Sequence, residues 1–419
     1  MFQSLLVQSF REEAKKNKDP RMSIEAEFDV AYPTGFLGFD FTNGVKVKVK
    51  NLEENLDFSY NSIGLVDGSM VSCVGRSGCG KTTFVLQSSG NIVRPFPNSA
   101  IFHEDIEGGS SSMRTRQLLN FSEEEFKGKY IHRNTGITTE NFYHRIKWIH
   151  DTKLANRKEY EYDTGLYDTD GHRIIKLQPT VVILDSLAML MPDDLIGDNK
   201  EDLSGGMAAT SIAKLNTQLI KTIIPMLKAA NIIFFCINHI LPDPSPTPKK
   251  AQVAWLKMGE RCPGGETSIY LANNFLRFDD SSKLTMDKDG LDGIKVSILL
   301  VKSRTNNAGK AVPMILDYAN GFDADLSLFE LLKDSGAIKG AGAYLYFEGH
   351  EDMKFSRKKF KEKLATEPEF VNAFAEASLK ELDKLTSSAA IESLHNNTEM
   401  PTISSTSVIL DMMKQQNVA

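Results

Sequence analysis

The segment GRSGCGKTT, residues 75–83, restricts the possible folds of this 419-residue chain more than any other feature. Its residues fit the pattern G-x-x-x-x-G-K-[ST], in which backbone N–H groups surround phosphates at the start of a helix. Such a loop lies between a buried strand and a helix, and the flanking segments SMVSCVG and KTTFVLQSSG have these two characters. The sequence therefore predicts an α/β core that binds a nucleoside triphosphate.

The loop also predicts the cofactors, ATP and Mg²⁺. Lys81 is expected to reach the β- and γ-phosphates, and the Thr82 hydroxyl to bind the metal. Asp185, at the end of the apolar segment TVVILD, is the expected carboxylate on the metal side. The nucleotide-binding residues predicted from the pattern are Gly75, Arg76, Ser77, Gly78, Cys79, Gly80, Lys81, Thr82, Thr83 and Asp185.

Hydrolysis further requires a group that orients water, and the apolar segment before HEDIEGG ends in three acids. Glu104, Asp105 and Glu107 are all candidates, and strand alternation does not distinguish them. The segment NIIFFCINHI ends in Asn238 and His239, which are expected near the γ-phosphate. For His239, a structural role and a phosphate-sensing role are equally compatible with the sequence.

Apolar segments recur along the chain in a β-α-β pattern, which predicts a mainly parallel sheet. IKVSILLVKSR and VPMILDY are expected as later edge strands, antiparallel or mixed, and 155–178 as an inserted β-hairpin. We predict four parts: an N-terminal helix and strand at 1–34, an ATPase core at 35–321, a small α/β domain at 322–385, and a flexible Ser/Thr-rich tail at 386–419. The N-terminal part is expected to serve oligomerisation by docking on a neighbouring subunit, and packing on its own chain is the alternative.

Composition is that of a globular protein, with 41% hydrophobic residues and a net charge of −6. Nucleic acid must therefore be bound by local basic surface rather than by bulk charge. The four cysteines lack metal-ligand spacing and are expected as buried thiols. No apolar run is long enough to span a membrane and no signal-peptide core is present, so a soluble, cytoplasmic protein is expected, in a bacterium or an infected host cell.

Two loops follow strands of the predicted core and are candidates for DNA binding. Residues 240–266 contain four closely spaced prolines, which disfavour packed helix or sheet, together with basic residues and one tryptophan. Residues 192–206 are acidic, but their glycines and the next helix could present N–H groups to phosphates. A solvated surface loop is the alternative for 240–266. The candidate DNA-binding residues are Gly205, Gly206, Met207, Lys249, Lys250, Trp255, Lys257, Arg261, Gly264 and Gly265.

The order of these segments resembles the RecA family of homologous-recombination ATPases, and its phage-type branch most closely. The resemblance covers about residues 33–365. It is carried by PTGFLGFDF, GRSGCGKTT, FHEDIE, ILDSLAML, CINHI, GGETSIYLANNFLRF, VKSRTNNAGK and the closing segment YANGFDADLSLFELLKDSGAIKGAGAYLYFEG. It implies a RecA-type ATPase core, an N-terminal element that docks on a neighbouring subunit, and a small C-terminal domain.

The resemblance also implies roles for single residues. Glu107 becomes the water-activating glutamate, and His239 takes the place of a γ-phosphate-sensing glutamine. Lys302 and Arg304 match a basic pair that completes the ATP site of the next subunit. The aromatic residue that stacks on adenine in some members has no clear counterpart, although Met113 and Arg114 lie near that place in the sequence.

The function that the resemblance implies is ATP-dependent homologous pairing and strand exchange by a filament on single-stranded DNA. Duplex DNA would be the second substrate, and a recombination mediator or single-stranded-DNA-binding protein an expected partner. Two alternatives remain: a hexameric RecA-fold helicase, and a non-catalytic DNA-binding regulator that keeps the fold. The inserts at 44–66 and 155–178 and the Ser/Thr-rich tail depart from the family pattern, and their roles stay open.

Overall fold

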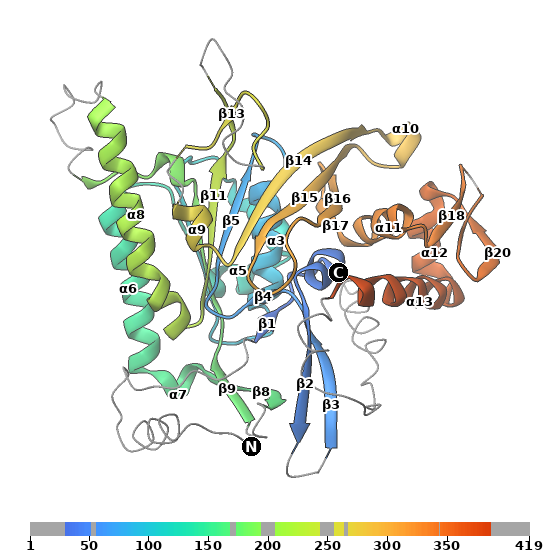
Figure 1. Cartoon of the computed structure of the whole chain (residues 1–419), viewed down its shortest axis with the longest axis horizontal. Helices are drawn as coiled ribbons and strands as arrows, with labels where there is room; N and C mark the ends of the chain where they lie inside the picture. Colours follow the sequence, from blue (N-terminus) through green and yellow to red (C-terminus); the bar gives the residue numbers. More distant parts are fainter. Residues whose placement is uncertain are drawn as a thin grey trace.

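The computed structural model describes residues 30–51, 56–167, 173–193, 206–243, 255–263, 267–342 and 344–386. Within them, a nine-stranded sheet forms the centre of the molecule, in the order β17-β16-β15-β14-β5-β11-β10-β6-β7 (Figure 1). Its strands are β5 (Met70–Gly75), β6 (Ile101–Asp105), β7 (Tyr130–Arg133), β10 (Thr180–Asp185), β11 (Ile232–His239), β14 (Asn274–Leu284), β15 (Gly293–Ser303), β16 (Ala311–Asp317) and β17 (Gly321–Asp323).

The direction of these strands confirms the predicted mixed sheet. Strands β7, β6, β10, β11, β5 and β14 are joined by parallel pairing. Strands β15, β16 and β17 then continue the sheet by antiparallel pairing. Because parallel strands all end at one edge of a sheet, the segments that follow β5, β6, β10 and β11 gather at that edge.

Helices cover both faces of the sheet, which explains why its central strands are apolar without alternation. Along β11, Ile233, Phe235 and Ile237 pack in the cluster that contains helix α3, whereas Ile232 and Phe234 pack with helices α6 and α8. Figure 1 shows α6 and α8 side by side along one side of the sheet. The helices around the core are α2 (Leu37–Thr42), α3 (Lys81–Val93), α4 (Ser112–Leu119), α5 (Glu123–Lys129), α6 (Thr139–Ala155), α7 (Arg157–Tyr160), α8 (Gly206–Ala229), α9 (Thr267–Leu271) and α10 (Met286–Asp289).

The two inserts form hairpins outside the central sheet. Strands β2 (Val45–Asn51) and β3 (Leu56–Ser62) pair along their whole length and project at the bottom of Figure 1. The predicted hairpin at 155–178 is confirmed by the pairing of β8 (Glu161–Tyr167) with β9 (Arg173–Leu177). Its first residues differ from the prediction, because α6 continues to Ala155 and α7 follows directly.

The C-terminal elements combine helices with a small antiparallel sheet, as the sequence indicated. Helix α11 (Ala324–Ser335) ends before Gly336, whose φ of +84° is a left-handed conformation that glycine adopts readily. Strands β18 (Ile338–Ala341), β19 (Tyr344–Phe347) and β20 (His350–Phe355) form the sheet. Helix α12 (Phe360–Thr366) is followed by a separate helix α13 (Pro368–Leu385), because Pro368 starts a new helix.

The predicted N-terminal docking element lies mostly outside the described residues, since these begin at residue 30. The end of its strand, β1 (Ala31–Tyr32), pairs with β4 (Leu65–Val66) of the same chain. The tail at 387–419 is likewise outside the described part, and the domain boundaries at 34, 321 and 385 stay predictions. In the part of the chain that the structure describes, no helix combines the length and apolarity that a membrane span needs.

Candidate nucleotide site and the residues around it

The predicted phosphate loop lies between β5, which ends at Gly75, and α3, which begins at Lys81. Gly80 is the N-cap of α3 with a φ of +85°, and a Cβ atom there would lie 2.7 Å from the Phe322 ring. Only glycine meets both conditions without strain. The loop therefore presents the unpaired N–H groups at the N-terminus of α3, which is the arrangement that binds phosphate oxygens.

Lys81 and Thr82 start this helix and point in different directions. The Lys81 side chain is buried, and its Nζ donates to the carbonyl oxygens of Gly75 at 3.0 Å and of Arg76 at 2.8 Å. The Thr82 hydroxyl donates to the Asp185 carboxylate at 2.6 Å. The sequence separation between Thr82 and Asp185 is bridged because β10 lies two strands from β5 and ends at the same sheet edge.

Thr82 and Asp185 supply the oxygen atoms that Mg²⁺ prefers in proteins, so these residues fit the predicted metal. Burial raises the pKa of the Asp185 carboxyl to about 6, although the Thr82 hydrogen bond lowers it. A metal cation would favour the ionised carboxylate. The Glu107, Asp185 and His239 ligand atoms lie within 4.8 Å of one another, which places further cation-binding groups beside the pair.

The structure separates the three acids that the sequence left open. Glu104 is buried and forms ion pairs with Arg133 at 3.6 Å and Arg145 at 3.3 Å. Asp105 accepts hydrogen bonds from the backbone N–H groups of Gly108 and Ser110, and so shapes the turn after β6. Of the three acids, Glu107 is the one that lines the cavity at the phosphate loop.

Two neighbouring side chains orient the Glu107 carboxylate. The Ser186 hydroxyl donates to Glu107 Oε1 at 2.6 Å, and His239 Nε2 lies 2.5 Å from the same oxygen. Burial alone would raise the pKa of Glu107, but these hydrogen bonds and the His239 charge outweigh it and hold the pKa below its usual value. Glu107 is therefore an ionised hydrogen-bond acceptor at neutral pH. Ser186 has no signal of its own in the sequence beyond its place after Asp185.

The cavity at the loop has a volume of about 420 Å³. It is lined by the phosphate loop with Glu107 and Asp185, and also by Arg114, Asp317 and Tyr318. The Tyr318 side chain is half exposed, and its carbonyl accepts a hydrogen bond from Arg114 at 3.1 Å. The sequence placed Arg114 near the expected base-binding region but missed Tyr318, which follows the strand VPMILD and could have been found there.

Lys302 and Arg304 lie at the other end of the strands from the phosphate loop of the same chain. Lys302 pairs with Phe275, which pairs with Ser72, whereas Gly75 at the start of the loop pairs with Phe278. Lys302 Nζ donates to the Ile269 and Tyr270 carbonyl oxygens, and Arg304 donates to Tyr270 at 3.3 Å. This arrangement keeps both cations away from the nucleotide site of their own chain.

The two predicted DNA loops are described only in part. Gly205, Lys249, Lys250, Gly264 and Gly265 lie outside the described residues. Gly206 and Met207 are the first residues of α8. Trp255, Lys257 and Arg261 belong to the described segment 255–263, which follows the proline-rich stretch.

The expectation that 240–266 forms no packed sheet is wrong at its ends. Strand β12 (Leu241–Pro242) pairs with β13 (Glu260–Arg261), and the Trp255 ring packs edge-on against Phe275 with ring centroids 4.8 Å apart. Proline lacks a backbone N–H but keeps its carbonyl as an acceptor. The Pro242 carbonyl accepts a hydrogen bond from the Arg261 side-chain Nε at 3.3 Å. The Trp255 ring thus packs against β14 through Phe275. Lys257 and Arg261 remain exposed.

All four cysteines are free. Cys262 is only partly buried, whereas Cys73, Cys79 and Cys236 are buried, as predicted. Burial raises the pKa of each of these thiols. Cys79 Sγ donates to the Arg76 carbonyl inside the phosphate loop, so it contributes to the shape of the loop.

Comparisons with known proteins give little beyond this geometry. No protein-family model matches the chain, and no curated protein matches it. Among solved structures, the chain is similar to the crystal structure of the RadB recombinase, with 19% sequence identity over 62% of this chain and 92% of that chain, at a TM-score of 0.38. A likeness at this level assigns no function, which must be argued from the site itself.

Proposed function

We propose that the chain is an ATP- and Mg²⁺-dependent recombinase of the RecA type. It would form a helical filament on single-stranded DNA and catalyse homologous pairing and strand exchange with a duplex. One observation supports the enzymatic part of this proposal: Lys81, the Thr82–Asp185 pair and the Glu107–His239 pair line one cavity, and Ser186 donates to Glu107 beside it. Phosphate binding, metal binding and water activation would then take place at a single site.

We expect each group in this site to have a separate role in hydrolysis. The helix N-terminus and Lys81 would hold the phosphates, and Mg²⁺ on Thr82 and Asp185 would neutralise charge on them. Glu107, ionised and held by two hydrogen bonds, would accept a hydrogen bond from the attacking water and orient it. His239 would couple the state of the nucleotide to the predicted DNA loop 240–266, because it contacts Glu107 and directly precedes this loop.

The positions of Lys302 and Arg304 support assembly into a polymer. Their place at the far end of the strands separates them from the phosphate loop of their own chain. They would instead serve the phosphate loop of a neighbour. A cation supplied across an interface stabilises charge on the transferred phosphoryl group only when subunits are assembled. ATP hydrolysis would then depend on the filament, and the filament on DNA.

Sequence-independent DNA binding is the part of the proposal that rests on the exposed cations Lys257 and Arg261 and on the predicted residues outside the described segments. Phosphate contacts would leave the bases free for pairing. A homology search requires this, because recognition must come from the bound strand and not from the protein.

The proposal is tested by electron microscopy of the full chain with single-stranded DNA, Mg²⁺ and a slowly hydrolysed ATP analogue. Long helical filaments and strand exchange that Lys81→Ala abolishes are the expected results. Closed rings without strand exchange would instead identify the hexameric helicase. Filaments on DNA with no ATPase activity in any condition would identify the non-catalytic regulator.

A further inference from the structure

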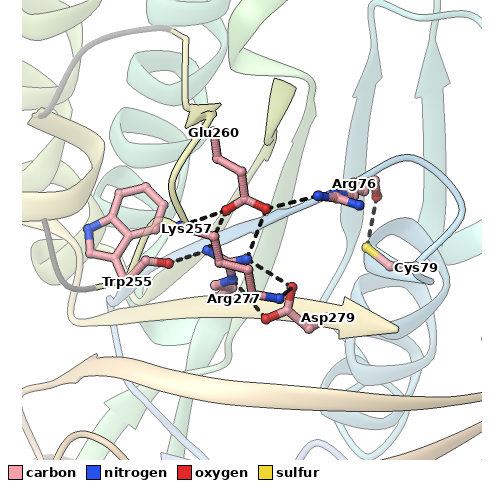
Figure 2. A network of polar contacts seen from close by, with 7 residues as sticks. All are labelled: Arg76, Cys79, Trp255, Lys257, Glu260, Arg277 and Asp279. Atoms are coloured by element: carbon pink, nitrogen blue, oxygen red, sulfur yellow. Dashed lines mark hydrogen bonds and ion pairs between the residues drawn. The ribbon is translucent and has the colours of Figure 1, made fainter. Parts of the chain in front are cut away.

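One ion pair joins the phosphate loop to the segment 255–263, and none of the predicted roles explains this contact. Figure 2 shows Glu260 between two arginines, Arg76 of the loop and Arg277 of β14. Arg277 Nη1 lies 2.9 Å from Glu260 Oε2, and the two side chains are 2% and 4% exposed. Arg76 Nη2 lies 3.2 Å from Glu260 Oε1.

Arg277 and Glu260 together fix the segment to the core. The Arg277 guanidinium also donates to the Trp255 carbonyl and forms an ion pair with Asp279 at 2.9 Å (Figure 2). Glu260 Oε2 accepts the Lys257 backbone N–H at 2.9 Å, which closes the turn before β13. The buried pair therefore holds both ends of the turn that carries Lys257, and Arg277 sits beside the end of β5 because it pairs with Val74.

Arg76 differs from Arg277 because its side chain and its backbone carbonyl contact two different parts of the molecule. Its side chain is 66% exposed and reaches Glu260. Its carbonyl oxygen, at the other end, accepts hydrogen bonds from Lys81 Nζ at 2.8 Å and from Cys79 Sγ at 2.8 Å. Phosphate oxygens would attract the Lys81 ammonium group. A bound phosphate would therefore compete with the Arg76 carbonyl oxygen for the hydrogen bond from Lys81.

We propose that Arg76 is a positioning residue that couples phosphate binding to the arrangement of segment 255–263. When Lys81 turns to a phosphate, the Arg76 carbonyl loses its strongest donor and the loop backbone is free to adjust. The Arg76 guanidinium then shifts relative to Glu260, and Glu260 carries the change to the Lys257 turn and to Trp255. The coupling rests on the proposed nucleotide site, but its route is specific to these side chains.

The Arg76–Glu260 contact can be removed without breaking the Arg277–Glu260 pair that attaches the segment to β14. Truncation of Arg76 leaves Glu260 paired with the buried Arg277, so the segment keeps its attachment to β14. An exposed side chain also contributes little to the stability of the core. Arg76→Ala should therefore fold, and Arg76→Lys keeps the charge that Glu260 needs.

Trp255 supplies a spectroscopic reporter, because the chain has two tryptophans and the other, Trp148, is on helix α6. In the full chain with Trp148→Phe, emission and acrylamide quenching of Trp255 are measured with and without saturating ADP and Mg²⁺. Nucleotide affinity is measured for each variant by calorimetry, so that all are compared at saturation. Arg116→Ala, an exposed arginine on α4, is the matched control.

The expected result is a change of the Trp255 signal on ADP binding that is at least about fivefold smaller in Arg76→Ala. Arg76→Lys should restore most of the change, and Arg116→Ala should leave it intact. Glu260→Gln should reduce the change as well, since it weakens the same contact from the other side.

Two outcomes overturn the inference in distinguishable ways. If ADP binds and the Trp255 change is absent, or is the same in Arg76→Ala, the coupling route is wrong while the nucleotide site stands. If calorimetry shows no nucleotide binding to the unsubstituted chain, the proposed function falls and the inference falls with it.

Discussion

His239 Nε2 lies 2.5 Å from Glu107 Oε1, so the end of β11 directly contacts the acid that follows β6. The two side chains come from strands that are separated by β10 in the sheet. Ser186, after β10 itself, donates to the same Glu107 oxygen. Three neighbouring strand ends thus fix one carboxylate, which is the arrangement expected of a group that must orient a water molecule.

Replacement of Glu107 by glutamine should lower the DNA-stimulated ATPase rate by about 10²–10⁴-fold, because the amide cannot accept a proton from water. Nucleotide affinity should change little, since the phosphate loop is intact. A steady-state ATPase assay with calorimetry checks both. Glu123→Gln, on the exposed surface of α5, is the control. An unchanged ATPase rate in Glu107→Gln would show that this carboxylate is not the water-activating group.

Arg304→Ala should reduce DNA-dependent ATPase activity by about 10³-fold or more, as loss of a cation supplied across an interface does elsewhere. The structure adds a sharper test, since Lys81 and Arg304 would serve different interfaces of one subunit. An equal mixture of Lys81→Ala and Arg304→Ala proteins should regain about one quarter of the active interfaces, because complementary subunits then meet by chance.

Each of these variants alone should be inactive, so recovery in the mixture cannot come from either parent. Arg116→Ala, mixed in the same way with Lys81→Ala, gives the reference for an interface in which the cation is intact. Normal ATPase activity of Arg304→Ala alone would rule out the trans role.

Lys257→Ala and Arg261→Ala should each weaken binding of single-stranded DNA uniformly across sequences and reduce the salt slope of log affinity by about 1. Both residues are exposed on the segment that the Arg277–Glu260 pair anchors. Fluorescence anisotropy over a salt series measures this. Lys127→Ala, on α5 and away from the segment, should leave the slope unchanged. Slopes identical to the parent in both variants would remove the segment from the DNA interface.

A stability measurement tests the buried carboxyl of Asp40. Burial raises the pKa of Asp40 to about 7, against hydrogen bonds from Thr34 and Gly35 that lower it. In the unfolded chain the carboxyl ionises near its ordinary pKa of 3.8, so between pH 3.8 and about 7 the folded state binds a proton that the unfolded state has released. The Asp40 contribution to stability is therefore favourable at low pH and is lost as the pH rises towards about 7.

Asp40→Asn removes this titration while keeping the shape of the side chain. The melting temperature of the variant relative to the parent should therefore increase from pH 5 to pH 8. Thermal unfolding across this range measures the difference, and Asp287→Asn on the exposed helix α10 should show no such trend. A constant difference across the range would mean that Asp40 is ionised throughout.

The local patterns of the sequence were sufficient for the main strands of the central sheet and for the phosphate loop. The continuous apolar segments before Gly75 and Asp185 are strands buried on both faces, and only helices on each side of a parallel sheet can provide this. The loop pattern fixes a glycine at residue 80, where a left-handed backbone turns into α3. These features depend on residues that are close together in the chain, so the sequence alone is enough to predict them.

What the sequence by itself could not decide depends on strand order. Strand alternation left Glu104, Asp105 and Glu107 equivalent, and only the family resemblance favoured Glu107. Nothing in HEDIEGG shows that Glu104 forms ion pairs with Arg133 and Arg145. The Arg76–Glu260–Arg277 ion pairs and the place of Tyr318 beside the cavity join residues that are far apart in the chain. Only the tertiary structure brings such residues together, since the order of strands in a sheet is set by the packing of the whole core and not by any one segment.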